Sequence, residues 1–232
     1  MNGKGIERIH FDEIGSTNDY AKSLRAQGAD VVVTADRQTG GHGTKGRAFS
    51  SETGGVYVTK LTFHDGLLAK NAFQIMASAA VAVCETLEFY GLRPVIKWVN
   101  DIYVEDKKIC GILIENVFSG DKVSSSIVGI GLNVCNVLPT ELKSIATTMA
   151  RILPSPPTVQ DVRERLIANL SASKGVEDYL QRIGYMGRRA TAIVGEEHIP
   201  VTLLSVDETG GLWVEMDGEK RRFAAAEISL QV

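Results

Sequence analysis

The sequence predicts an α/β fold in two parts, an α/β domain followed by a small, barrel-like β module. Three observations predict it. Runs of apolar and β-branched residues alternate with helical patterns through the first part of the chain, and residues 69–90 carry Ala, Met, Val and Leu at helical spacing. Residues 188–232 then change to short strands separated by glycine turns. We therefore expect a large domain over residues 1–186 and a β module over residues 187–232.

The N-terminal elements follow from alternation and capping. Residues 7–14 have the composition of a strand. Ser16 begins a helix, because Asp19 follows it at the spacing of a capping box, and the helix is expected to run to about Gln27 and to end at Gly28. Two further strands are predicted before the long helix, at 31–35 and 55–63.

The central region contains the clearest helix and a hairpin. Residues 69–90 form the helix, which Gly91 ends. Strands at 102–104 and 109–117 form a hairpin around a charged turn at 105–108. The remaining elements are strands at 95–98 and 125–133, a turn at 119–121, and helical residues at 158–183 after the proline-rich stretch 154–157.

Composition narrows the class of protein. The net charge of −3 argues against a dedicated nucleic-acid binder, which is usually basic overall or along a stripe. Cys84, Cys110 and Cys135 are odd in number and form no CxxC or Cys/His pair, so they are expected to be reduced core residues of a cytoplasmic protein. No signal peptide is evident, and no stretch approaches the roughly 20 apolar residues of a membrane span.

A glycine-rich loop with basic residues, 38–47, is the first segment that indicates chemistry. It satisfies G-x-G-x-x-G, but a strand follows it where a dinucleotide fingerprint needs a helix. It lacks the Gly-Lys-Ser/Thr of a Walker loop, and the chain has no kinase H-R-D or D-F-G motif. We interpret it as an anion cradle, in which glycine backbone N–H groups and the charges of Lys45 and Arg47 meet oxygen atoms. The alternative is a flexible surface loop.

A second segment brings cations, a carboxylate and a tight glycine position to nearby strands. It comprises Lys97-Trp98-Val99-Asn100-Asp101 and, after the charged turn, Lys108-Ile109-Cys110-Gly111-Ile112-Leu113-Ile114-Glu115. Together with the glycine loop, this segment suggests chemistry on a phosphate or an acyl phosphate.

In this combination the chain resembles the biotin–protein ligases. That family carries a G-R-G-R-x-G-R-x-W-type loop, a K-W-P-N-D segment, a K-x-x-G-I-L-x-E strand and a G-x-G-x-N strand, in this order. The matching segments here are 41–49, 97–101, 108–115 and 129–133, and Ser16-Thr17-Asn18 and Glu227-Ile228-Ser229-Leu230 match two further family features. The resemblance covers residues 14–232.

The resemblance implies a fold, a reaction and partners. The fold would be a mixed-sheet catalytic domain of the biotin/lipoate ligase type with a small C-terminal SH3-like domain. Biotin and MgATP would give biotinyl-5′-AMP, and the biotin would then pass to one lysine of a biotin carboxyl carrier protein domain. ATP, Mg²⁺ and biotin are consumed or recruited in turnover, so no permanently bound cofactor is expected. No N-terminal DNA-binding domain is expected, and a homodimer and a monomer fit equally well.

Lys108 is the strongest catalytic candidate implied. A fixed ammonium group beside the biotin carboxylate and the α-phosphate would stabilise the charge that builds up during attack. The alternative is a solvated lysine in a charged hairpin. Asp101 would take the proton of the incoming lysine amine, whose reference pKa is about 10.4, or contact Mg²⁺; its alternative is an Asx turn. Arg47 and Lys45 complete the catalytic set.

The resemblance also assigns binding residues. Those expected to contact biotin are Ser16, Thr17, Asn18, Gln38, Gly41, His42, Gly43, Thr44, Lys108, Gly111, Ile112, Gly129 and Leu132. Those expected to contact ATP are Arg47, Phe49, Trp98, Asn100, Lys108 and Asn133. Ser16 and Thr17 also suit helix capping, and Trp98 suits a core position equally well.

The loop departs from the family pattern. His42 and Thr44 stand where arginines are usual, and Lys45 or Arg47 would then supply the charge. Val99 replaces the usual proline. We expect the loop to be mobile when empty and ordered over the adenylate, because a mixed anhydride must be kept from water.

Two other functions compete. A lipoate or octanoate ligase of the same superfamily also acylates a carrier lysine, but the Lys97–Asp101 segment and the loop favour biotin. A non-catalytic biotin or adenylate sensor would explain the missing arginines. Turnover with ATP separates these alternatives.

Overall fold

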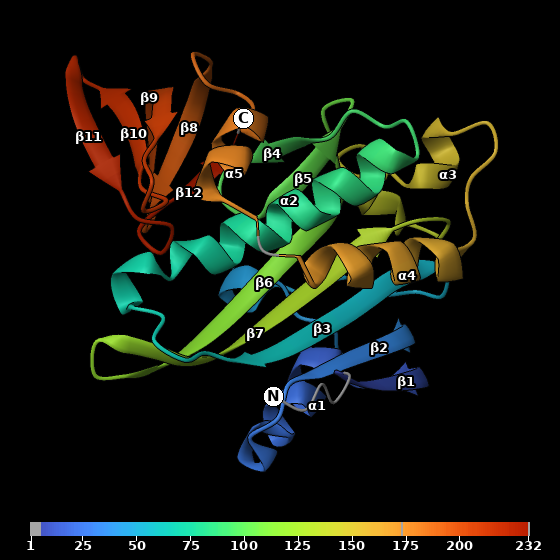
Figure 1. The fold of residues 1–232 in the computed structure, drawn as a ribbon. Coiled ribbons are helices and arrows are strands. Elements are labelled where there is room, and N and C mark those ends of the chain that lie inside the picture. The colour runs from blue at the N-terminus through green and yellow to red at the C-terminus, as the bar shows by residue number, and fades with distance from the viewer. Residues whose placement is uncertain (1–5, 173, 232) are drawn as a thin grey trace.

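A seven-stranded mixed sheet forms the body of the protein, with helices packed over it and a separate five-stranded sheet beside it (Figure 1). The computed structural model describes residues 6–172 and 174–231, and the side chain of Lys45 lies outside what it describes. The main sheet has the order β1-β2-β3-β7-β6-β5-β4, in which β1 and β2 are parallel and the other neighbours are antiparallel. Its strands are β1 (Glu7–Ile14), β2 (Val31–Gln38), β3 (Gly55–Phe63), β4 (Val95–Lys97), β5 (Asp101–Val104), β6 (Lys107–Ser119) and β7 (Lys122–Asn133).

Helix α1 (Thr17–Ser23) is shorter than predicted. Ser16 caps it as expected, because its side chain accepts a hydrogen bond from the Asp19 N–H at 3.3 Å. The helix ends at Ser23, and a short 3₁₀ turn continues to Gln27. Gly28 then ends the 3₁₀ turn in the left-handed region, at φ 68°, as glycines commonly do at the C-terminal end of a helix.

The hairpin between β5 and β6 turns more tightly than predicted. Only Glu105 and Asp106 form the turn, and both lie in the left-handed region, at φ 51° and 57°. Two positive φ angles in a row are the geometry of a two-residue hairpin turn whose twist matches its strands. Lys107 and Lys108 therefore belong to β6, so the position of Lys108 is set by strand pairing.

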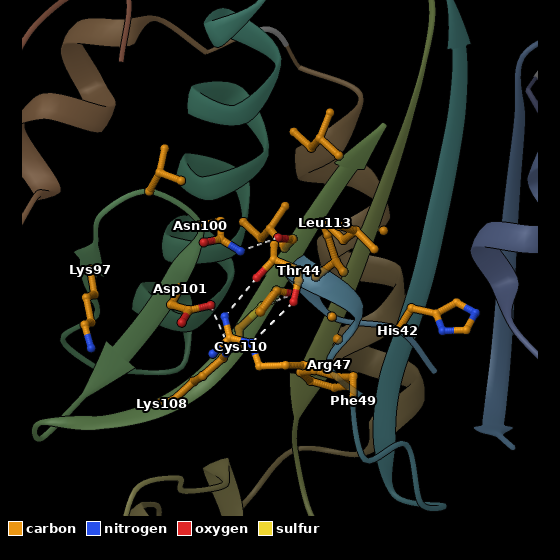
Figure 2. Close-up of a pocket in the computed structure, with 18 of the residues that line it drawn as sticks. His42, Thr44, Arg47, Phe49, Lys97, Asn100, Asp101, Lys108, Cys110 and Leu113 are labelled. Atoms are coloured by element: carbon orange, nitrogen blue, oxygen red, sulfur yellow. Dashed lines mark hydrogen bonds and ion pairs between the residues drawn. The ribbon is translucent and has the colours of Figure 1, made fainter. Parts of the chain in front are cut away.

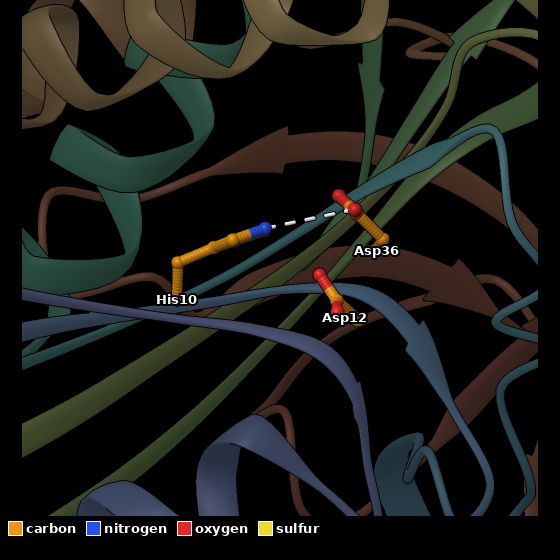
Figure 3. Close-up of side chains that lie close together, drawn as sticks. All are labelled: His10, Asp12 and Asp36. Carbon is orange, nitrogen blue, oxygen red and sulfur yellow. Dashed lines mark ion pairs between the residues drawn. The ribbon is translucent and has the colours of Figure 1, made fainter.

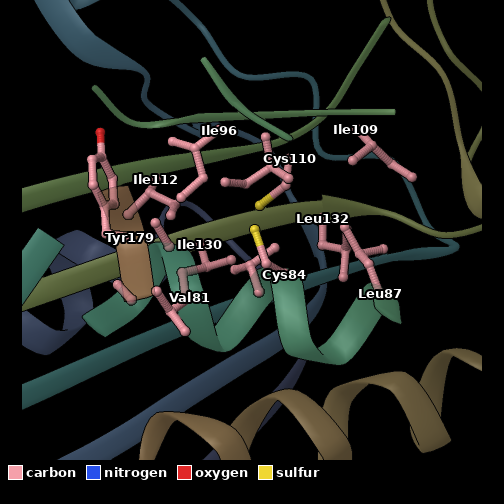
Figure 4. Close-up of a cluster of buried hydrophobic side chains, with 14 of the residues drawn as sticks. Val81, Cys84, Leu87, Ile96, Ile109, Cys110, Ile112, Ile130, Leu132 and Tyr179 are labelled. Atoms are coloured by element: carbon pink, nitrogen blue, oxygen red, sulfur yellow. The ribbon is translucent and has the colours of Figure 1, made fainter. Parts of the chain in front are cut away.

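Helix α2 (Phe73–Phe89) covers the main sheet and packs against α4 (Val159–Leu170) and α5 (Val176–Arg182). Residues 69–89 are long and apolar enough to cross a membrane, contrary to the sequence expectation, with a mean hydropathy of 1.3. Their packing inside the protein accounts for this composition, because α2 contributes Val81, Cys84 and Leu87 to the main core (Figure 4).

The helical stretch predicted at 158–183 is two helices. Gly175 begins the second one, and the Asp178 carboxylate accepts a hydrogen bond from the Gly175 N–H at 3.1 Å, which caps the new start. A short helix, α3 (Met149–Ile152), precedes them and was not predicted.

The cysteine prediction holds for two of the three residues. Cys84 and Cys110 are buried in the core, where burial raises the pKa of the Cys84 thiol to about 12. Cys135 is exposed, so the expectation that all three are core residues is wrong. It follows β7 at the surface of the molecule.

The second sheet confirms the β module expected after the composition shift. It is antiparallel throughout, in the order β11-β10-β9-β8-β12. Its buried residues, among them Leu203 and Val214, join the same core cluster as α2. The turn at Gly210 also accepts a hydrogen bond from the Trp98 indole N–H at 3.0 Å. Its strands are β8 (Arg189–Val194), β9 (Glu197–Val206), β10 (Leu212–Met216), β11 (Glu219–Phe223) and β12 (Ser229–Gln231).

Candidate functional site

The two segments singled out in the sequence meet in one cavity of about 670 Å³. Its wall comes from the glycine loop, strands β4 to β7, the start of α1 and the segment 225–230, which leads into strand β12 of the second sheet. Of the predicted site residues, those that line it are Ser16, Thr17, Asn18, Gln38, His42, Gly43, Thr44, Arg47, Phe49, Trp98, Asn100, Asp101, Lys108, Gly111, Ile112, Gly129 and Asn133.

Three predicted residues are not among the lining. Leu132 is fully buried in the core beside Leu87 and Cys84 (Figure 4). It does not line the cavity, which corrects the expectation that it contacts biotin. Its neighbours Gly131 and Asn133 line the cavity instead, because alternate residues of a strand face opposite sides of the sheet. Gly41 is buried beneath Phe49 and Ser51, and the Lys45 side chain lies outside the described part of the chain.

Lys108 and Asp101 form the charged centre of the cavity. The Lys108 ammonium lies 2.7 Å from the Asp101 carboxylate (Figure 2). Strand pairing brings them together, since Asp101 on β5 pairs with Gly111 and Tyr103 pairs with Lys108. About a third of the Lys108 side chain remains exposed, so its charge faces the cavity and is not sealed in the core.

Lys97 is a further cation of the site that sequence reasoning left out of the site residues. It lines the cavity and lies 5.1 Å from the centre of the Tyr103 ring. Burial lowers the pKa of Lys97; the Asp101 carboxylate opposes this shift, and the nearby charges of Lys108 and Arg47 add to it. The sequence signal that could have identified Lys97 is its position in the same short segment as Asp101. An anion such as a phosphate would relieve the repulsion among these three cations.

The Phe49 ring lies against two glycines, Gly111 and Gly131, and all three residues line the cavity. Gly111 and Gly131 are directly opposite each other on β6 and β7. A Cβ atom on Gly131 would come within 2.3 Å of the Phe49 ring, and one on Gly111 within 3.1 Å. The two glycines therefore provide the space that this aromatic ring occupies, and Gly131 is a site residue that the sequence reasoning missed.

The glycine loop is closed on itself and on α1. The Arg47 guanidinium donates to the Thr44 hydroxyl at 3.1 Å, and the Gly43 N–H donates to the Arg47 carbonyl at 2.6 Å. His42 lies 2.9 Å from the Asp19 carboxylate. Burial alone would raise the pKa of Asp19, but the hydrogen bonds from His42 and Lys22 outweigh it and lower the pKa.

A polar network forms another part of the wall. The Gln38 amide oxygen accepts hydrogen bonds from the N–H and the hydroxyl of Thr17, at 2.8 and 2.9 Å. The Gln38 amide nitrogen donates to the Ser51 hydroxyl at 3.0 Å. Gln38 is thus fixed in one orientation, and Thr17 joins it to the buried residues Asn18 and Thr59.

Three further lining residues use their polar side-chain groups in hydrogen bonds to backbone carbonyls: Asn100, Asn133 and Trp98. The Asn100 amide donates to the Ile112 carbonyl at 2.7 Å, and the Asn133 amide donates to the Thr147 carbonyl at 3.1 Å. The Trp98 indole N–H is directed to Gly210 in the second sheet. These contacts fix the shape of the wall around Asp101.

Asp101 is the one carboxylate among the described residues that line the cavity. A single carboxylate, with phosphate oxygens from a nucleotide, is the usual environment of Mg²⁺ in nucleotide sites. The donor set therefore fits a cation that arrives with its substrate.

A second cluster of metal-ligating side chains lies elsewhere, on β1 and β2 (Figure 3). It consists of His10, Asp12 and Asp36. Arg163 donates to Asp36 at 2.9 Å and lies 3.2 Å from the His10 ring nitrogen, so a guanidinium already provides the positive charge there. We interpret the cluster as a surface ion-pair network.

Comparisons with known proteins match this arrangement. Residues 11–133 match the family described as biotin/lipoate A/B protein ligase. The bifunctional ligase/repressor BirA of Bacillus subtilis is 39% identical over 154 residues, covering 63% of this chain and 47% of that protein. BirA of Escherichia coli is 25% identical over 234 residues, covering 94% of this chain and 72% of that protein. The chain thus spans about half the length of the first curated relatives it matches.

A solved structure extends the likeness to nearly the whole chain. The biotin protein ligase of Aquifex aeolicus, in complex with biotin and ATP, superposes with a TM-score of 0.76 at 29% identity, covering 97% of this chain and 98% of that one. The likeness therefore includes both sheets.

Proposed function

Because the chain belongs to the biotin/lipoate A/B protein ligase family, we propose that it is a biotin–protein ligase. It activates biotin with ATP to biotinyl-5′-AMP and transfers biotin to one lysine of a biotin carboxyl carrier protein domain. The observation that carries the proposal is the single cavity that joins a neutral hydrogen-bonding wall at Thr17, Asn18 and Gln38 to a charged centre at Lys108 and Asp101. The structure of the Aquifex aeolicus protein of similar fold is a complex with biotin and ATP.

Lys108 acts in the first step. The biotin carboxylate attacks the α-phosphorus of ATP, pyrophosphate leaves, and negative charge builds on the oxygens between them. An ammonium held by Asp101 at a strand position needs little reorganisation to stabilise that charge. The positive charges of Lys97 and Arg47 attract the phosphates of ATP. The Asp101 carboxylate would bind Mg²⁺ together with these phosphates.

The glycine loop protects the adenylate. Arg47 at the end of the loop and Phe49 just after it line the cavity, so a closed loop keeps water from the mixed anhydride. In the second step the carrier lysine enters beside Asp101, which takes the amine proton as nitrogen attacks the biotinyl carbonyl and AMP leaves.

We assign the chemistry to a domain of residues 1–186 and a supporting role to residues 187–232. Support for the second assignment comes from Ala225, Ala226 and Ile228, which line the cavity although they belong to the β module. The partner we propose is the carrier domain of a biotin-dependent carboxylase, in the cytoplasm.

The test is ATP–pyrophosphate exchange with biotin, then lipoate, then octanoate. We expect exchange with biotin alone. Exchange with lipoate or octanoate would move the chain to the sister ligases of the family. Tight biotin binding without exchange would make it a sensor, and Thr44→Arg would then be the first variant to examine.

A further inference from the structure

Thr59, in the middle of β3, is a fully buried polar residue that no sequence motif includes. Its hydroxyl lies 2.8 Å from the Thr17 hydroxyl and 2.6 Å from the amide oxygen of Asn18. A buried hydroxyl is costly unless it is hydrogen-bonded, so its partners indicate its purpose. Both partners line the cavity, whereas Thr59 itself does not.

Among the residues that the structure describes, only the oxygen of the Asn18 side-chain amide has a hydrogen-bond partner. Asn18 is 7% exposed, and its oxygen is the atom near Thr59. Within residues 6–172 and 174–231, its amide nitrogen has no hydrogen-bond partner. An amide group with two donors and no partner, at the wall of a cavity, is suited to an acceptor on a ligand.

The Thr59 hydroxyl proton decides which end of the amide faces the cavity. The Thr17 hydroxyl donates its one proton to the Gln38 oxygen, so toward Thr59 it can only accept. Thr59 then donates to its nearer partner, the Asn18 oxygen. Without that donor, a half turn of the amide would exchange the oxygen and the nitrogen and present the opposite polarity.

Gly129 supplies the space in which the amide lies. It pairs with Thr59 across β3 and β7, and a Cβ atom there would come within 2.1 Å of the Asn18 oxygen and 2.7 Å of its nitrogen. Gly129 therefore accommodates Asn18, and the amide is held from two neighbouring strands.

We propose that Thr59 is a positioning residue for ligand recognition. It fixes Asn18 with its NH₂ group toward the cavity, where that group donates to the carbonyl oxygen of the biotin ureido ring. The inference rests on the proposed function for the ligand, and it adds a residue that acts only through Asn18. Such a site selects ligands that present an acceptor to the Asn18 NH₂ group. If the amide were turned around, its oxygen would face the ureido oxygen, and two buried acceptors would lie unpaired against each other.

The test compares Thr59→Val, which replaces the hydroxyl with a methyl group, with Thr86→Val. Thr86 is equally buried, and its hydroxyl donates to the Ala82 carbonyl within α2. We expect Thr59→Val to weaken biotin binding about tenfold in calorimetry. The KM for ATP and the kcat at saturating biotin should stay unchanged, because Thr59 touches no reacting group. Thr59→Ser should restore binding, and Thr86→Val should leave it unchanged.

A double-mutant cycle with Asn18→Ala separates positioning from general packing. If Thr59 acts through Asn18, adding Thr59→Val to Asn18→Ala should cause no further loss of biotin affinity. Additive losses, or equal losses in Thr59→Val and Thr86→Val, would overturn the inference. Wild-type protein that binds no biotin would overturn the proposed function itself, whereas wild-type binding matched by Thr59→Val would overturn only the role of Thr59.

Discussion

Lys108 reaches the cavity because a two-residue turn places it early in β6. Its neighbour Lys107 begins the same strand, is exposed, and is not among the residues that line the cavity. The two lysines share a charge, a strand and a local sequence, but only Lys108 contacts Asp101. Position, and not the presence of a positive charge in the hairpin, is therefore what the proposed chemistry requires.

At this scale we predict that Lys108→Met lowers biotin-dependent ATP–pyrophosphate exchange by about 100-fold or more, the usual effect of removing one group that stabilises transition-state charge. Lys107→Met is the matched control and should retain near-wild-type exchange. Equal losses in the two variants would show that the hairpin contributes only general positive charge.

At the scale of elements, the glycine loop is the part whose contacts are most local. Its Arg47 side chain bonds to Thr44 within the loop, and His42 holds the loop to α1 through Asp19. These are exposed, polar contacts between short segments, which open more easily than a packed core. The loop is therefore suited to admit substrate and to close afterwards.

We predict that Arg47→Ala increases the release and hydrolysis of biotinyl-5′-AMP severalfold, because one of the charges expected to hold the adenylate is lost. The measurement is AMP formed per biotin transferred in the presence of the carrier. Arg93→Ala changes an exposed arginine that does not line the cavity and serves as the control. An unchanged leak rate in Arg47→Ala would contradict a retaining role for this side chain.

The elements also show what the sequence could and could not predict. Alternation and capping located the strands at 7–14 and 55–63, because those signals are local. The break at Gly175 was missed, since each side of it is helical by composition. Gly131 lines the cavity and Thr59 lies behind Thr17 and Asn18 because of which strands pair, and pairing between distant strands leaves no local signal.

On the scale of the whole molecule, the two sheets behave as one packed body. The core cluster runs from α2 into the second sheet, and the turn at 207–211 contacts both Trp98 and the Phe73 side chain. Within that turn, Asp207 accepts hydrogen bonds from Arg222 at 2.7 Å and from the Gly211 N–H at 3.0 Å. A change in this turn should therefore affect the stability of the entire chain.

The turn gives a pH-dependent prediction. The hydrogen bond from Arg222, followed by those from Thr209 and Gly211, holds the pKa of Asp207 well below its usual value. Because the folded pKa lies below the unfolded value of about 3.9, ionised Asp207 stabilises the fold above that pH and loses this contribution as the pH falls. We expect Asp207→Asn to lower the Tm at pH 7, with a gap to wild type that narrows between about pH 5 and pH 2. Glu208→Gln, at an exposed neighbouring carboxylate, should track wild type, and a gap that stayed constant with pH would contradict the assignment.

The turn also gives the protein an optical signal of its own. The chain has two tryptophans, and both indole N–H groups end at this turn: Trp98 donates to the Gly210 carbonyl at 3.0 Å and Trp213 to the Asp207 carboxylate at 3.2 Å. Trp98 also lines the cavity. We therefore expect intrinsic fluorescence to report both the contact between the two sheets and the binding of the nucleotide we propose for the cavity. Trp213→Phe would leave Trp98 as the single tryptophan, so that its emission reports on the cavity without a dye.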